Sequence, residues 1–147
     1  MGNLISKTGQ KTLIGALEMH LQAFMFEAVT TTWSKLILMD APGIVAPVVL
    51  TGRYRSNWVI GVGAPNTATP SSGGSPGAPS APPGPPVLPA LNIGEVVYLT
   101  NSLPYAGRLE AGHSKKAPQG VVGPVVADLS TDLDGIVALI NAGNLHP

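Results

Sequence analysis

Residues 103–120, LPYAGRLEAGHSKKAPQG, lie between a predicted strand and the predicted last helix of this 147-residue chain. The first half, PYAGRLEAG, predicts a short helix that ends at Gly112, because glycine readily adopts the left-handed conformation that closes helices. The second half, HSKKAPQG, predicts a loop. The stretch also gathers ionisable side chains in a chain of which only 11% is charged, namely Tyr105, Arg108, Glu110, His113, Lys115 and Lys116.

After this stretch, residues 121–142 predict a second long helix. Pro124 is compatible with its first turn, where no intrahelical N–H bond is lost, and Gly143 is the expected stop. Apolar residues recur at three- and four-residue steps and form one stripe, made of Val122, Val125, Val126, Leu129, Leu133, Ile136, Val137 and Ile140.

Before the stretch, residues 57–63 and 94–100 predict an antiparallel pair of strands. In YRSNWVIGVG, Tyr54, Ser56, Trp58 and Ile60 alternate with polar or smaller residues, as in a half-buried strand. The connection between the strands is residues 64–89, a Pro/Gly/Ser-rich segment with nine prolines. Because proline lacks the backbone N–H that sheets and helices need, we expect this insert to be a flexible or polyproline-like excursion.

Residues 8–39 predict one long helix, with Leu13, Leu17, Leu21 and Phe24 on its apolar stripe. The three threonines at 30–32 are poor helix formers, and indicate either a bend or a helix that closes and restarts. The segment DAPG at 40–43 ends the helix. The sequence therefore predicts a single α+β domain over residues 1–147, with a long N-terminal helix, a small antiparallel sheet with a long Pro-rich connection, a short helix and a C-terminal helix.

The composition limits the function. The chain has no cysteine, so disulfides and thiolate metal sites are excluded. The formal net charge is zero, whereas a dedicated nucleic-acid binder normally carries a basic excess. A monomer with little charge and much apolar surface is poorly soluble, which favours burial of some of that surface against other subunits.

No residue pattern indicates catalysis or a cofactor. Ser102, His113 and Asp128 are the types of a hydrolytic triad, but no nucleophile elbow surrounds the serine. Glu110 and His113 have a spacing compatible with metal ligation, but Gly112 ends the helix between them and a zinc site needs three or four ligands. We therefore expect a protein that is not an enzyme and that holds no cofactor or metal.

The charged residues are better explained as contacts. Arg108 and Glu110 are too close along their helix to pair with each other, and are placed to pair with another chain. The basic residues could touch phosphates, although no nucleic-acid motif accompanies them. The candidate subunit-interface residues are Arg53, Arg55, Tyr105, Arg108, Glu110, His113, Lys115 and Lys116.

Two segments carry a resemblance to a known family. APVVLTGRYRSNW resembles the Thr-Pro-Val-Asp-Thr-Gly-Arg-Leu-Arg-x-Ser-Trp segment of the neck, or tail-completion, proteins of tailed double-stranded-DNA bacteriophages. VYLTNSLPYAGRLEAGHSKKAPQGVVGPVV resembles that family's second segment through Asn101, Tyr105, Ala106, Glu110, Gly112, Ser114, Ala117, Pro118 and Gly120. The chain departs from the family pattern at Leu50, where an aspartate is usual, in its longer insert, and in lacking a final strand after the last helix.

The resemblance implies a structural virion protein made in the bacterial host cytoplasm. It would form a homo-oligomeric ring in the neck, between the head connector or stopper and the tail proteins, around the DNA channel. It would lie near DNA without reading its sequence, and no membrane is implied. The alternative from a different class is a small protein-binding module that uses the Pro-rich arm as its ligand.

Overall fold

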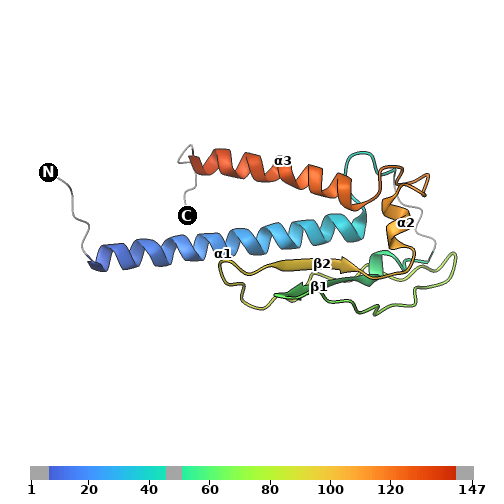
Figure 1. The fold of residues 1–147 in the computed structure, drawn as a ribbon, viewed down its shortest axis with the longest axis horizontal. Helices are drawn as coiled ribbons and strands as arrows, with labels where there is room; N and C mark the ends of the chain where they lie inside the picture. Colours follow the sequence, from blue (N-terminus) through green and yellow to red (C-terminus); the bar gives the residue numbers. More distant parts are fainter. Residues whose placement is uncertain (1–6, 46–50, 142–147) are drawn as a thin grey trace.

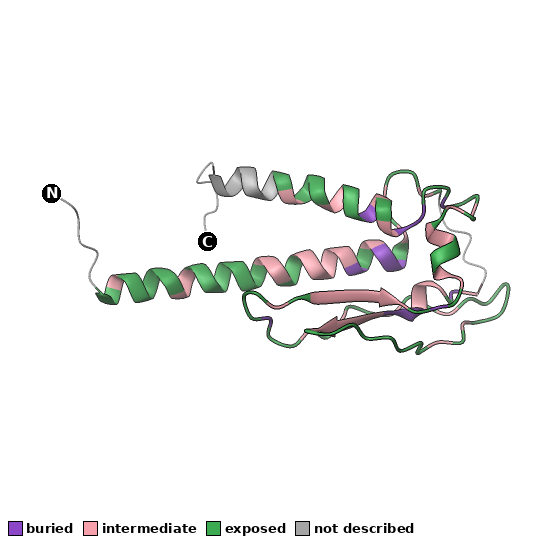
Figure 2. Ribbon diagram, viewed as in Figure 1, coloured by how far each residue is buried: buried purple, intermediate pink, exposed green. Residues whose placement is uncertain are grey.

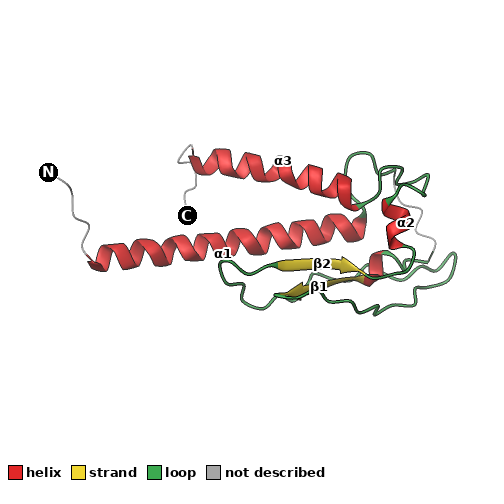
Figure 3. Ribbon diagram, in the orientation of Figure 1, coloured by secondary structure: helices red, strands yellow, loops and turns green. Residues whose placement is uncertain are grey.

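A computed structural model describes residues 7–45 and 51–141 of the chain, with side chains up to residue 134. It has the predicted α+β class (Figures 1 and 3). In chain order, the elements are helix α1 (Lys7–Leu38), a short 3₁₀ helix η1 (Arg55–Asn57), strands β1 (Trp58–Val62) and β2 (Val97–Asn101), and helices α2 (Ala106–Glu110) and α3 (Val122–Asn141). The expected stop of the last helix at Gly143 lies outside the described residues.

Helix α1 runs without interruption through the threonines at 30–32, so neither a break nor a restart occurs there. The hydroxyl of Thr30 donates to the carbonyl of Phe26, and the hydroxyl of Thr32 donates to that of Ala28. The helix ends at Leu38 because Met39 adopts the left-handed conformation, with φ of 53°. The N–H of Asp40 then donates to the carbonyl of Lys35, which closes the last turn.

Strands β1 and β2 form an antiparallel two-stranded sheet, with Trp58 opposite Asn101 and Ile60 opposite Leu99. The predicted pairing is confirmed, but its bounds are corrected. The second strand begins at Val97 and not at residue 94, because Gly94 lies in a turn with φ of 91°. Asn57 belongs to η1, and not to the strand, because its side chain is turned inward to bind backbone groups. Trp58 and Ile60 share the face that packs into the core, as the alternation predicted.

The core lies at one end of the molecule, where the last turns of α1, the start of α3 and the sheet meet (Figure 2). Val121 and Val125 of the loop and first turn of α3 are 1% and 0% exposed. They pack with the buried end of α1 and with the sheet, in a cluster of Trp33, Leu36, Ile37, Trp58, Ala117, Val121 and Val125.

An ion pair joins the two long helices. The ammonium group of Lys35 on α1 lies 3.3 Å from the carboxylate of Asp132 on α3 and also donates a short hydrogen bond to Asp128. Asp128 and Asp132 are four residues apart and therefore lie on the same face of α3. The hydrogen bond to Asp128 raises the pKa of Lys35 most, burial opposes it, and Asp132 adds to the rise.

The Pro-rich insert is held against the body and is not a free excursion. The carbonyl of Thr51 accepts the N–H groups of Gly74 and Ser80, and the indole of Trp33 donates to the carbonyl of Gly84 over 3.2 Å. Pro82, Pro83, Pro85 and Pro86 line a shallow groove beside α1, opposite Trp33 and Ile37. Backbone N–H groups of Gly74 and Ser80 and the indole of Trp33 supply hydrogen bonds that the prolines cannot make.

The N-terminal half of α1 extends beyond the body. Helix α3 runs back beside α1 but stops well before the N-terminal end of α1 (Figure 1). The projecting half is almost entirely exposed (Figure 2), including Met19 and four large apolar side chains on the opposite side of the helix. Leu13 is 61% exposed, Ile14 55%, Leu17 57% and Leu21 40%.

Candidate subunit interface

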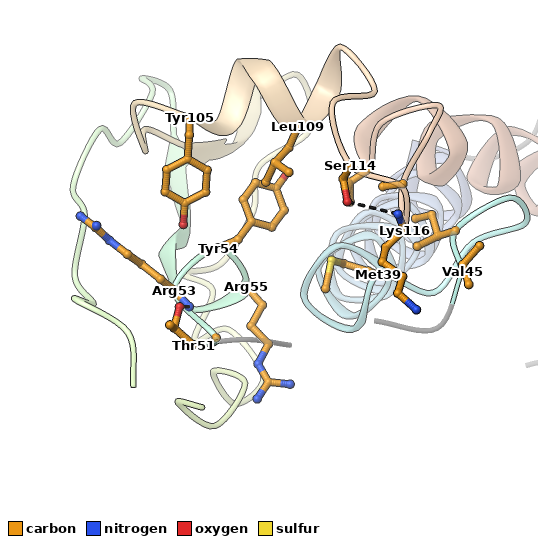
Figure 4. Close-up of a pocket in the computed structure, with 14 residues that line it drawn as sticks. Met39, Val45, Thr51, Arg53, Tyr54, Arg55, Tyr105, Leu109, Ser114 and Lys116 are labelled. Atoms are coloured by element: carbon orange, nitrogen blue, oxygen red, sulfur yellow. Dashed lines mark hydrogen bonds between the residues drawn. The ribbon is translucent and has the colours of Figure 1, made fainter. Parts of the chain in front are cut away.

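Three segments meet around a pocket of about 450 Å³ at the end of the body (Figure 4). The first follows α1 and includes Met39, the second runs from Thr51 to Arg55, and the third runs from Tyr105 to Val121. Its lining is mostly apolar, from Ile44, Leu109 and their neighbours. Four of the eight predicted interface residues line it, and these are Arg53, Arg55, Tyr105 and Lys116.

The two arginines do not converge on one point. The guanidinium of Arg55 donates to the carbonyl of Ser80 in the insert, and its Nε is buried without a hydrogen-bond partner. Arg53 is exposed, and its guanidinium points away from that of Arg55 (Figure 4). A bidentate clamp on a phosphate or carboxylate needs donors that point at one anion, so this pair does not build one.

The two tyrosines of the pocket have raised pKa values. Burial raises the pKa of Tyr54, and the charge of Glu110 and then Tyr105 raise it further. Burial also raises the pKa of Tyr105, against an opposing effect of Arg53. Tyr54 packs edge-on against Trp58, with ring centroids 5.8 Å apart. Both hydroxyls therefore stay protonated at neutral pH, and the rings serve as apolar surface.

Glu110 has an intramolecular role that the sequence did not reveal. One carboxylate oxygen accepts the N–H groups of Val121 and Val122, and the other accepts that of Gly123, all at 2.9 Å. Burial raises the pKa of Glu110, but the three backbone hydrogen bonds outweigh it and leave the pKa below its ordinary value. Glu110 thus caps the N-terminus of α3, where a negative charge is favoured.

The loop around Glu110 depends on two glycines. Gly112, with φ of 78°, ends α2 as predicted. Gly120, with φ of 79°, has no room for a side chain, because a Cβ would lie 2.6 Å from the carbonyl oxygen of Glu110. Residues 103–120 are therefore shaped to bring one carboxylate against the start of α3.

The remaining predicted residues surround the pocket without lining it. Arg108, His113 and Lys115 are exposed on α2 and the following loop. Arg108 has no ion-pair partner in the described part of the chain, and neither does Lys115. Their assignment to a subunit interface stays a prediction.

Two structural sites were missed from the sequence. Asn57 is fully buried, donates to the carbonyls of Arg53 and Ser71, and accepts the N–H of Ser71. It fastens the insert to η1, and no sequence pattern marks it. The Lys35 site did leave a signal, since Asp128 and Asp132 have the four-residue spacing of a shared helix face.

Within residues 7–45 and 51–141, no group of three or more metal-ligating side chains comes together. In the same residues, no helix is both long and apolar enough to cross a membrane. Comparison of the chain with protein-family models, with curated proteins and with solved structures finds no match in any of the three.

Proposed function

We propose that this protein is a structural subunit of a homo-oligomeric ring in the neck of a tailed bacteriophage, joining the head connector to the tail around the DNA channel. The resemblance of residues 46–58 and 97–126 to neck proteins suggests the class. The observation that carries the proposal is the two-stranded sheet, because no other described strand covers the outer edge of β2.

The geometry of the sheet favours pairing with another chain. Among the described residues it contains only β1 and β2. The side chain of Asn66 in the insert donates to the carbonyl of Ile60 on the outer edge of β1, whereas no strand or insert contact covers the outer edge of β2 among these residues. An uncovered edge carries backbone donors and acceptors that pair readily with a strand of another chain. In the ring, these edges form the wall, and the loop at residues 103–120 with its exposed Arg108, His113 and Lys115 contacts a neighbour.

The packing of the insert weakens the alternative of a binding module with a proline-rich ligand arm. A ligand for a proline-binding groove must present its prolines freely in an extended helix. Here Pro83 and Pro86 are half-buried beside α1, and Trp33 and Asn57 hold the segment through its backbone. Deletion of residues 66–88 would therefore damage the fold itself, since it removes the partners of both side chains.

Electron microscopy of the purified protein, together with mass analysis of virions from the phage that encodes it, tests the proposal. We expect particles with cyclic symmetry and a central channel, and we expect the protein in the virion. A strictly monomeric protein that is also absent from virions would exclude the proposed function. Charge reversal of Arg108 is the accompanying variant, and it should impair ring formation without unfolding the exposed helix on which the residue lies.

A further inference from the structure

The projecting half of α1 has the residue spacing of a helix that pairs with another helix. Ile14, Leu17, Leu21, Phe24 and Ala28 follow one another at steps of three, four, three and four. Steps of this kind keep side chains on one seam, where they interlock with those of a second helix. Toward the C-terminal end of α1 the same side of the helix carries Lys35, which contacts α3. Toward the N-terminal end, Ile14 and Leu17 are more than half exposed.

We propose that the projecting half of α1 pairs antiparallel with the projecting half of α1 from a second copy of this chain. The paired surface is the stripe formed by Leu13, Ile14, Leu17 and Leu21. This inference goes beyond the ring. A contact of this type is isologous and closes on itself, whereas a cyclic ring is built from head-to-tail contacts. The pair is therefore a property of the free chain.

The charges beside the stripe select a second copy in the antiparallel direction. Lys11 and Glu18 flank the stripe on the same side, and neither has an ion-pair partner among the described residues. When Ile14 of one copy faces Leu17 of the other in an antiparallel pair, Lys11 of each copy comes beside Glu18 of the other. The symmetry forms this contact twice. In a parallel pair, Lys11 and Glu18 of the two copies would lie on opposite sides of the seam and could not form this contact.

The stripe has the size of a reversible interface. Each of its four exposed side chains presents on the order of 100 Å² of apolar surface, which gives about 800 Å² for the two copies. This lies in the range of weak and transient complexes, below about 1,200 Å². The pairing involves residues 7–24, a length of about 27 Å. We therefore expect a dimer that forms as the protein concentration rises.

Sedimentation velocity of the full chain tests the proposal, from about 5 µM to about 500 µM, a span suited to an interface of this size. We expect a shift from monomer to dimer within it. Leu17→Glu should weaken dimerisation at least about tenfold. Met19→Glu is the matched control, because Met19 is 66% exposed but lies on the opposite side of α1, and it should leave dimerisation unchanged.

A charge exchange tests the direction of the pair. Lys11→Glu and Glu18→Lys should each weaken dimerisation, and the double variant should restore it, because the contact between the copies is re-formed with the signs reversed. A chain that stays monomeric over the whole concentration range would overturn the proposal. The stripe would then be left to another occupant, either residues 142–147 or a different protein. A double variant no better than either single one would also overturn it. Rings through the sheet edges do not need Leu17, so loss of rings and loss of this pair are separate results.

Discussion

The two ends of α1 belong to one uninterrupted helix but have opposite surroundings. At the C-terminal end, Trp33, Leu36 and Ile37 are buried, and Lys35 is paired with α3. At the N-terminal end, Leu13 and Leu17 are equally apolar and more than half exposed. An isolated helix of this length gains little stability in water without packing. The comparison separates the part of the helix that holds the fold from the part that is available to another chain.

The most decisive test of this comparison makes the same Leu→Ala substitution at both ends of α1. Leu36→Ala removes a side chain that is 3% exposed and should lower the free energy of unfolding by about 3 kcal/mol. Leu17→Ala should change it by less than about 0.5 kcal/mol in dilute solution, because its side chain is already hydrated. Chemical denaturation of both variants measures the difference. Equal losses would contradict the division of α1.

The next largest effect belongs to Asn57, which joins the body to the insert. Asn57→Ala leaves the carbonyls of Arg53 and Ser71 and the N–H of Ser71 without their partner. We expect a loss of about 2–3 kcal/mol in unfolding free energy. Asn66→Ala is the control, because Asn66 is an exposed asparagine of the same insert and should cost less than about 1 kcal/mol. Proteolysis of the insert should become faster in Asn57→Ala but not in Asn66→Ala.

Glu110→Gln tests the capping of α3. Removal of the charge should cost about 1–2 kcal/mol at pH 7, because three backbone N–H groups lose a carboxylate acceptor. The pKa of Glu110 is lowered in the folded state, so its contribution is complete above the ordinary value of 4.5 and is lost as the pH falls through the folded value. The gap between wild type and variant should therefore close in acid. Glu18→Gln, on the exposed half of α1, should change the unfolding free energy at pH 7 by less than about 0.5 kcal/mol in dilute solution.

The smallest effect is expected at the Lys35 ion pair. Lys35→Gln should cost about 0.5–1 kcal/mol, as for partly exposed pairs. The pKa of Lys35 is raised, so its contribution is present at neutral pH and disappears as the pH rises through a folded value above 10.5. Thermal unfolding at pH 7 and at high pH measures this. If Lys35→Gln lowered the stability relative to wild type as much at high pH as at neutral pH, the charge of Lys35 would not be the cause of the loss.

The sequence predicted the helices and strands better than the hydrogen bonds that join them. The two long helices, the two strands and the stop at Gly112 are local patterns, and they appear close to their predicted positions. The expectation that the apolar stripe of α1 packs in the core was wrong for Leu13, Leu17 and Leu21, which are exposed. Asn57 was assigned to a strand because alternation extends into its segment, whereas its actual partner is Ser71, fourteen residues away. The acceptor at the start of α3 is Glu110, eleven residues before Val121, beyond the reach of any local capping pattern.

The division of α1 also explains why the insert is tolerated. Residues 64–89 lie along the sheet and the C-terminal half of α1, where Trp33 and Asn57 provide buried hydrogen-bonding groups. Further along, Leu88 and Leu91 line a shallow groove together with Gln22, Ala23 and Phe26. Residues 7–21 remain uncovered by this segment, so the insert enlarges the body and leaves the projecting half free.

Hydrogen exchange along α1, measured on the full chain at low and at high protein concentration, tests this division most directly. We predict that amides of residues 29–38 exchange slowly at both concentrations. Amides of residues 11–21 should exchange quickly when dilute and become protected when concentrated, because only then does a second chain cover them. Uniform protection along α1 that does not depend on concentration would contradict the account, as would a projecting half that stays unprotected in concentrated solution.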